Sequence, residues 1–353
     1  MTQIKSLFLF CFACFLLVGC SDKSSGKLEF STVIDLKGSF WNVHEMLGQA
    51  TQIYASRDYF IVRNNSVDNT KLLAIDLETK QNPIYFGATG AGPLELANAG
   101  PMVVDSVSVR IYDAGGSKLL NYQLDNFAHG SPAVDRIFRT KGRGGVISLA
   151  SLSDSVYVVS GIFPEGRLCL INQDGEIISW VGDYPMPPDV SVEVPFHVLG
   201  IAYQSKICRK PGGSRVALAA RYGGIVQIFD IDVFNGTAVE IKRINTFFPT
   251  FSTWDFDGTP NFRSTEDTKW GYLSVASSDK YIFALYSGKY QRQGESFNTS
   301  NQIHVFDWDG NPHCLINLDT DGSFIAVNKD KLFLLTSDPD NGYDIVEYKL
   351  LNL

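Results

Sequence analysis

The chain has 353 residues, of which 44% are hydrophobic, 12% aromatic and 19% charged. This composition can supply a large core, which excludes global disorder, and its 31 glycines favour short strands joined by tight turns. The formal net charge of −8 argues against nucleic acid as a partner, because phosphate binding needs a basic face.

The first twenty residues have the pattern of an export signal. Lys5 precedes an apolar run over residues 6–18, which has the length of a signal-peptide core and is short for a membrane span. The run ends in Leu17-Val18-Gly19-Cys20, and a Ser-rich polar stretch follows. This resembles a bacterial lipoprotein signal, which implies that Cys20 carries a lipid. An ordinary secretory signal with an incidental cysteine is the alternative.

We therefore expect residues 1–19 to be a signal peptide and residues 20–27 to be the lipidated cysteine with a flexible tether. The acylated Cys20 would bind a lipid bilayer. Ser21 without an immediate Asp fits sorting to the outer membrane, by analogy with other Gram-negative lipoproteins, and leaves open whether the protein faces the periplasm or the exterior. Three further cysteines, an odd number in apolar contexts, are expected to be buried thiols: Cys169, Cys208 and Cys314.

A hairpin pattern repeats six times after the tether. Each copy has a turn residue that opens one strand and, further on, an alternating apolar strand that ends in an aromatic residue or Ile. In the six copies, this alternating strand covers residues 72–76, 119–123, 168–172, 226–230, 303–307 and 345–349. The offset from turn to strand end is 17, 17, 17, 16, 27 and 18 residues, and a polar insertion at residues 287–295 explains the longest. So regular an offset indicates a repeated structural unit.

The units predict an all-β fold, a six-bladed β-propeller spanning residues 28–353 as one domain. One further apolar stretch precedes most of the turns, and polar turns lead into a fourth strand, so each unit holds four strands. The chain ends after the third strand of the last unit. An N-terminal strand is expected to complete that blade, and the alternating residues 28–36 are the segment we expect to supply it.

Residues 86–96 read Phe-Gly-Ala-Thr-Gly-Ala-Gly-Pro-Leu-Glu-Leu. With the lipoprotein signal and the repeats, this stretch resembles the Gly-x-x-Gly-x-Gly-Pro-Gly-Glu-Phe motif of TolB-like six-bladed propeller lipoproteins of Bacteroidetes, although Leu94 and Leu96 depart from it. The resemblance implies an exported propeller and brings no catalytic residues. Either the loop cradles an anion with Glu95 orienting a ligand, or, as we favour, Glu95 bonds backbone amides in a crossover between blades.

The sequence holds no recognisable catalytic or metal motif. His44 lacks the partner of a zinc protease motif, and His304 is expected to be packed in a strand. Acidic turns at residues 255–258, 307–310 and 319–322 resemble the opening of a calcium loop without completing it, so we interpret them as β-turns and keep calcium only as a possible divalent cation. The Asp-Ser-Val tripeptides around Ser106 and Ser155 resemble an O-glycosylation acceptor, but they also open strands of the repeat.

The richest departure from the repeat lies at residues 247–270. Its aromatic and charged residues suit a recognition surface over a rigid scaffold, although they could equally cap blades and plug the channel. The candidate binding residues are Trp254, Asp255, Phe256, Asp257, Arg263 and Trp270 in this segment, with Trp41 and Glu95 elsewhere.

Two functions follow from these features. The first is a binding module, anchored through Cys20, that recognises a protein, a peptide or a glycan in the cell envelope. The alternative is a metal-dependent hydrolase or lactonase-like propeller whose Asp, Glu and Asn ligands come from different blades and meet in the axial channel. The sequence itself identifies no ligand.

Overall fold

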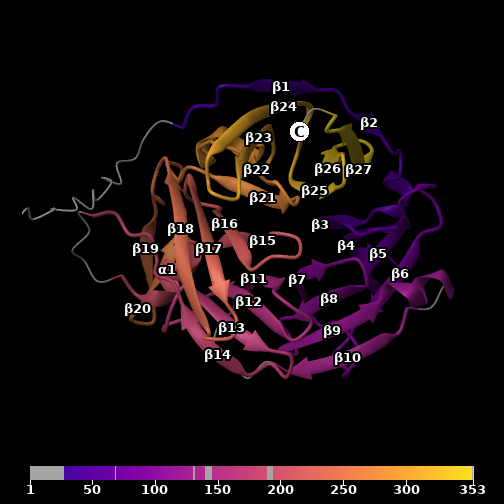
Figure 1. Ribbon diagram of the computed structural model, residues 1–353, viewed down its shortest axis with the longest axis horizontal. Helices are drawn as coiled ribbons and strands as arrows, with labels where there is room; N and C mark the ends of the chain where they lie inside the picture. Colours follow the sequence, from indigo (N-terminus) through magenta and orange to yellow (C-terminus); the bar gives the residue numbers. More distant parts are fainter. Residues whose placement is uncertain (1–27, 68, 130–131, 140–144, 189–193, 352) are drawn as a thin grey trace, which may run out of the picture.

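The computed structural model describes residues 28–67, 69–129, 132–139, 145–188, 194–351 and 353. These residues form a separate two-stranded sheet and six larger sheets, and the six larger sheets follow one another around a ring in chain order (Figure 1). The predicted six-bladed β-propeller is therefore confirmed. The signal peptide, the lipidated Cys20 and the tether predicted for residues 1–27 lie outside the described residues. Within the described part of the chain, no helix is long and apolar enough to cross a membrane.

The first four blades each contain four consecutive antiparallel strands, and the first strand of each lies nearest the axis. Blade 1 holds β3 (Gln49–Ala55), β4 (Tyr59–Val67), β5 (Thr70–Asp76) and β6 (Ile84–Ala88). Blade 2 holds β7 (Ala99–Val104), β8 (Ser108–Asp113), β9 (Lys118–Gln123) and β10 (Val134–Arg139). Blade 3 holds β11 (Val146–Ser151), β12 (Val156–Gly161), β13 (Leu168–Asn172) and β14 (Ile177–Val181). Blade 4 holds β15 (Ser205–Arg209), β16 (Arg215–Ala220), β17 (Ile225–Asp232) and β18 (Thr237–Asn245).

The last two blades complete the ring. Blade 5 holds β21 (Tyr272–Ser277), β22 (Tyr281–Tyr286), β23 (Ser300–Asp307) and β24 (Pro312–Gly322). Blade 6 holds β25 (Phe324–Asn328), β26 (Lys331–Asp338) and β27 (Gly342–Lys349). A separate hairpin, β19 (Ser252–Phe256) and β20 (Thr259–Arg263), lies between blades 4 and 5 in the sequence. Helical segments are short: η1 (His44–Met46), η2 (Leu124–His129), α1 (Phe196–Ala202) and η3 (Gln291–Asn298).

Two short N-terminal strands bind the last two blades. β2 (Ser39–Phe40) pairs antiparallel with β27, so an N-terminal strand closes the last blade, as predicted. The prediction that residues 28–36 supply that strand is wrong, because β1 (Val33–Leu36) pairs in parallel with β24 of blade 5 instead. The half-buried alternation of β1 suits the outer edge of the long strand β24, and pairing there removes an exposed edge.

The chain passes from one blade to the next at Gly38. A Cβ atom at this position would lie 2.3 Å from Cγ1 of Val346, so only glycine permits the close approach. The backbone N–H of Gly38 donates to the carboxylate of Asp319 on β24. We predicted a β-turn for residues 319–322, but these residues belong to β24, and the carboxylate of Asp319 serves this crossing.

A group of four residues, here called the closure cluster, holds the seam between the N-terminal segment and blades 1 and 6. It consists of Trp41, Lys80, Lys331 and Glu347. The buried Glu347 carboxylate accepts a hydrogen bond from Trp41 Nε1 at 3.0 Å, and it pairs with Lys331 at 2.8 Å and Lys80 at 3.1 Å. The indole of Trp41 packs edge-on against Phe60 of blade 1 and against a blade 6 phenylalanine, Phe333.

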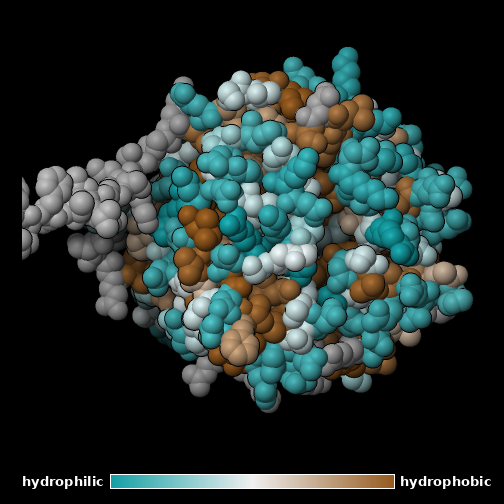
Figure 2. Space-filling view, viewed as in Figure 1, coloured by the Kyte–Doolittle hydropathy of each residue, from teal (hydrophilic) through white to brown (hydrophobic). Residues whose placement is uncertain are grey.

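The hydrophobic core is divided among the six interfaces between neighbouring blades. Leu72 of blade 1 and Val109 of blade 2 belong to one hydrophobic cluster, for example, and Val158 of blade 3 and Phe229 of blade 4 to another. Middle strands such as β12 are buried along their whole length because each blade is covered on both faces. The outer strand β18 alternates instead, because only one of its faces is covered. Figure 2 shows that hydrophilic side chains dominate the visible face of the ring.

The three cysteines expected to be buried thiols are buried and free. His304 is also packed, as expected. It lies among Phe30, Tyr272 and Tyr286, and burial lowers its pKa to about 3, so the imidazole is neutral at physiological pH.

Candidate functional site

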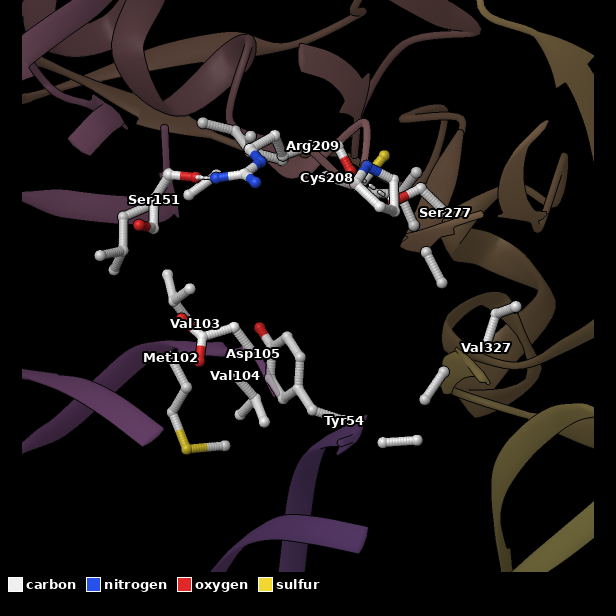
Figure 3. A pocket seen from close by; sticks show the side chains of 18 of the residues that line it. Tyr54, Met102, Val103, Val104, Asp105, Ser151, Cys208, Arg209, Ser277 and Val327 are labelled. Carbon is white, nitrogen blue, oxygen red and sulfur yellow. Dashed lines mark hydrogen bonds between the residues drawn. The ribbon is translucent and has the colours of Figure 1, made fainter. Parts of the chain in front are cut away.

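A cavity of about 720 Å³ occupies the axis of the ring, and all six blades line it. Its walls come from the innermost strands β3, β7, β11, β15, β21 and β25 and from the turns after several of them. Figure 3 shows the labelled side chains around this opening, with the hydroxyl of Tyr54 pointing toward the cavity. The volume lies within the range of small-molecule binding sites. We refer to this cavity as the axial pocket.

The repeat places corresponding residues of the six innermost strands around the axial pocket. The first lining residue of each strand is Gln52, Met102, Ser148, Lys206, Ser274 or Phe324. We call this set the floor ring. Lys206 is its only charged member. The backbone N–H of Ile207 donates to Ser148 Oγ, and that of Ile325 donates to Ser274 Oγ, both at 3.1 Å. In these bonds each serine oxygen is the acceptor, so the serine O–H can still donate a hydrogen bond to a ligand.

Lys206 extends from blade 4 toward blade 6. Its Nζ atom lies 5.8 Å from the centre of the Phe324 ring, which belongs to a blade two positions further along the ring. The ammonium is thus held at the deep end of the axial pocket by a cation–π contact, a weak interaction compared with an ion pair. Gln52, in the same floor ring, is 6% exposed, and its Oε1 atom has no hydrogen-bond partner among the described residues.

Two further cations lie close enough to affect this lysine. The guanidinium of Arg63 donates to the carbonyl oxygens of Ala99 and Gly100, and that of Arg221 lies 4.3 Å from the Trp270 ring centre. Burial, with a contribution from both arginines, lowers the pKa of Lys206 to about 8. Over the described part of the chain, no carboxylate forms an ion pair with any of these three cations. The deep end of the pocket is therefore positive in an acidic protein.

The mouth of the axial pocket carries both signs of charge. Asp105 pairs with Arg110 at 2.7 Å, and Asp154 approaches the same guanidinium at 3.7 Å. Arg209 lines the pocket opposite, where its Nη1 donates to the Ser151 carbonyl at 2.5 Å (Figure 3). The two carboxylates at the mouth thus lie close to the guanidinium of Arg110. The lysine on the floor has no carboxylate partner among the described residues.

Cys208 also lines the axial pocket, but its environment does not suit nucleophilic chemistry. Burial raises the pKa of its thiol to about 12, so the thiol stays protonated at neutral pH. The described residues contain no group of three or more His, Cys, Asp or Glu side chains placed to hold a metal ion.

The predicted recognition segment at residues 247–270 forms the hairpin of β19 and β20. Asp257 and Gly258 adopt positive φ angles of 52° and 76° at its turn, and Asp255 accepts the Gly258 N–H. Trp254 and Phe256 are 46% and 63% exposed and contact each other edge-on. Arg263 is exposed at the end of β20. None of these residues lines the axial pocket, so they do not plug the channel.

Two tryptophans that we predicted as binding candidates are buried instead. Trp270 packs against Tyr222 and Phe297, and Arg221 covers its ring. Trp41 belongs to the closure cluster. Packing, rather than surface recognition, accounts for both side chains.

Glu95 holds the glycine-rich loop together. Its Oε2 atom accepts the Gly92 N–H at 2.8 Å, and a Cβ at Gly90 would lie only 1.9 Å from that oxygen. The carbonyl of Gly92 accepts from Lys118, which is buried beside Asp113. The glycine spacing of this motif thus makes room for a buried polar network between blades 1 and 2.

The remaining acidic turns bond to themselves. Asp307 Oδ1 accepts the N–H groups of Asp309 and Asn311, which is the hydrogen bonding of a turn. Ser106 and Ser155 are exposed in the turns that open the second strands of blades 2 and 3.

Sequence analysis did not identify the residues of the axial pocket. The signal that could have found them is the pair of cations Lys206 and Arg209 in a short innermost strand whose counterparts are largely apolar or small. A charge at such a position needs a reason, because burying it costs free energy.

These features define a six-bladed β-propeller with a polar pocket on its axis. The chain belongs to the TolB-like 6-blade propeller-like family, whose model matches residues 58–330. A search of curated proteins returns no significant match.

Two solved structures with similar folds come from Bacteroides. A member of the DUF4221 family from Bacteroides vulgatus has a TM-score of 0.52 and 12% identity, with 88% of this chain and 93% of that chain covered. A protein from Bacteroides fragilis that is described as exported has a TM-score of 0.51 and 12% identity, with 90% and 99% covered. At this identity the likeness concerns the fold alone.

Proposed function

We propose that this protein is an exported, lipid-anchored binding protein that captures a small ligand, a glycan or short peptide, in its axial pocket. The observation that carries the proposal is the axial pocket itself, since all six blades line it and its floor holds polar side chains from several of them. Solvent-accessible pockets with a few convergent polar groups on an apolar wall are the usual form of small-molecule sites. A pocket of this size is too small for a folded partner, which favours the glycan and peptide classes over a whole protein.

The ligand can be sought with the full chain, purified in detergent and incubated with the small-molecule and glycan fraction of an envelope extract. We expect mass spectrometry to recover a bound molecule from the wild type, and much less from Val104→Trp or Val327→Trp, because indole groups at these lining positions fill the cavity. Val239→Trp, at a side chain that is 63% exposed on β18, is the control. Recovery of no ligand, or of equal amounts from all variants, would overturn the proposal.

The anchor part of the proposal rests on Leu17-Val18-Gly19-Cys20 and on the described fold, which begins eight residues after Cys20. A tether of that length spans at most about 29 Å, which would hold the propeller against the outer membrane.

Replacing Cys20 by Ala is expected to release the protein from the membrane fraction, because the lipid would then be absent. Fractionation of cells, together with metabolic labelling by a palmitate analogue, measures this directly. Cys314→Ala, at a buried thiol, should keep the label and stay with the membrane. A Cys20→Ala protein that still sediments with membranes would show that another feature anchors it.

A further inference from the structure

The floor ring contains one cationic side chain, Lys206. The residues beside Lys206 indicate which kind of ligand group it could bind. Lys206 is flanked in the ring by Ser148 from blade 3 and Ser274 from blade 5, whose innermost strands adjoin β15. Each of these serine oxygens accepts a backbone N–H and still has an O–H that can donate to a ligand. An ammonium and two hydroxyl groups that line one pocket suit an oxyanion.

The other polar groups of the pocket suit hydroxyl groups. Gln52 lines the pocket with a side chain that is more than nine-tenths buried, and its Oε1 atom has no donor among the described residues. The phenol of Tyr54 points into the same cavity (Figure 3). Apolar walls from Val104 and Val327 complete the pocket, and such walls pack against the C–H faces of a ring. This combination of one oxyanion position, acceptors for hydroxyls and apolar faces matches an acidic sugar.

We propose that the axial pocket selects a sugar, or a sugar-like polyol, that bears a carboxylate or a phosphate, and that Lys206 is the residue that recognises the oxyanion. The inference rests on the proposed function, because it assigns a ligand class to the same pocket. Arg63 and Arg221 add to the positive potential at the floor, while the acidic groups at the mouth, Asp105 and Asp154, are engaged by Arg110. An anion that passes the mouth, where Arg209 also lies, meets at the floor a lysine that has no carboxylate partner among the described residues.

Titration calorimetry of the full chain tests the proposal with glucuronate, galacturonate, glucose 6-phosphate, glucose and galactose as probes. We expect at least one charged sugar to bind, and each neutral counterpart to bind at least tenfold more weakly. Lys206→Met should weaken binding of the charged sugar at least tenfold and leave the weak binding of neutral sugars unchanged. The matched control is Lys349→Met, which removes an exposed lysine on β27 and should leave binding unchanged.

The probes distinguish a carboxylate ligand from a phosphate ligand, and the two experiments together distinguish failure of this inference from failure of the proposed function. Preference for glucose 6-phosphate over both uronates assigns a phosphate, and the reverse assigns a carboxylate. Equal binding of charged and neutral sugars, unchanged affinity in Lys206→Met, or no binding of any charged probe would overturn the inference. If the extract experiment recovers a neutral, pocket-dependent molecule, the proposed function stands and this inference fails. If that experiment recovers no pocket-dependent molecule, charged or neutral, both fail.

Discussion

Replacing Glu347 by glutamine is expected to lower the free energy of unfolding by about 2–3 kcal/mol at pH 7. Burial alone raises the pKa of this carboxyl, but the hydrogen bonds from Lys331, Lys80 and Trp41 outweigh burial and lower the pKa to about 2, from an ordinary value of 4.5. A difference of that size corresponds to about 3 kcal/mol of stabilisation of the charged form. Glutamine keeps the shape but removes the charge that both lysines face.

The stabilisation by Glu347 should disappear in acid. Because the pKa is lower in the folded state, the contribution is complete above pH 4.5 and is lost as the pH falls from 4.5 toward 2. Urea unfolding at pH 7, 5, 4 and 3 measures the difference between the wild type and Glu347→Gln, which should shrink over the last two steps. Glu78→Gln, at an exposed side chain, is the control. A difference that stays constant with pH would contradict this account of the closure cluster.

Replacing Lys206 by methionine is expected to stabilise the protein, by about 1–3 kcal/mol at pH 7. The ammonium is removed from water without gaining a carboxylate partner among the described residues, and burial, aided by Arg63 and Arg221, lowers its pKa from 10.5 to about 8. Folding with this group charged therefore costs free energy, which methionine of similar length avoids. Partial exposure of the side chain reduces the cost below the full value of the shift.

The sign of the pH dependence distinguishes this effect from simple repacking. The wild type binds fewer protons when folded, so its stability should rise relative to Lys206→Met between pH 8 and 10.5, and the advantage of the variant should vanish there. Urea unfolding at pH 7, 8, 9 and 10 provides the measurement, with Lys349→Met expected to stay within about 0.5 kcal/mol of the wild type throughout. A Lys206→Met protein less stable than the wild type would show that the lysine is a structural residue.

The fold could be predicted from the sequence because it repeats. Six copies of one hairpin pattern give six blades, and the narrow offsets between turn and strand end identify the unit even where an insertion lengthens it at residues 287–295. The partner of an N-terminal strand is less predictable. β1 and β2 lie within one stretch of eight residues. Which of them meets β27 depends on the crossing at Gly38, a tertiary constraint that alternation alone does not encode.

The candidate site was the less predictable part. An aromatic-rich insertion such as the one around Trp254 is visible in a sequence. The convergence of Gln52, Lys206 and Phe324 is not, because it depends on six strands meeting at one axis. Those residues are up to 272 positions apart, and no local spacing joins them. Trp41 and Trp270 show that an aromatic residue in an irregular segment can also lie in the interior, since both side chains are buried.

The pairing of β1 with β24 has a mechanical consequence. A pulling force applied at the start of the described chain acts along β1, parallel to the strand that it is bonded to, so all hydrogen bonds of that ladder resist sliding at the same time. Only after β1 detaches would the load reach the pairing of β2 with β27, which is only two residues long. The pairing of β1 with blade 5 thus protects the pairing of β2 with β27, which closes the ring, from a force applied at the N-terminal end.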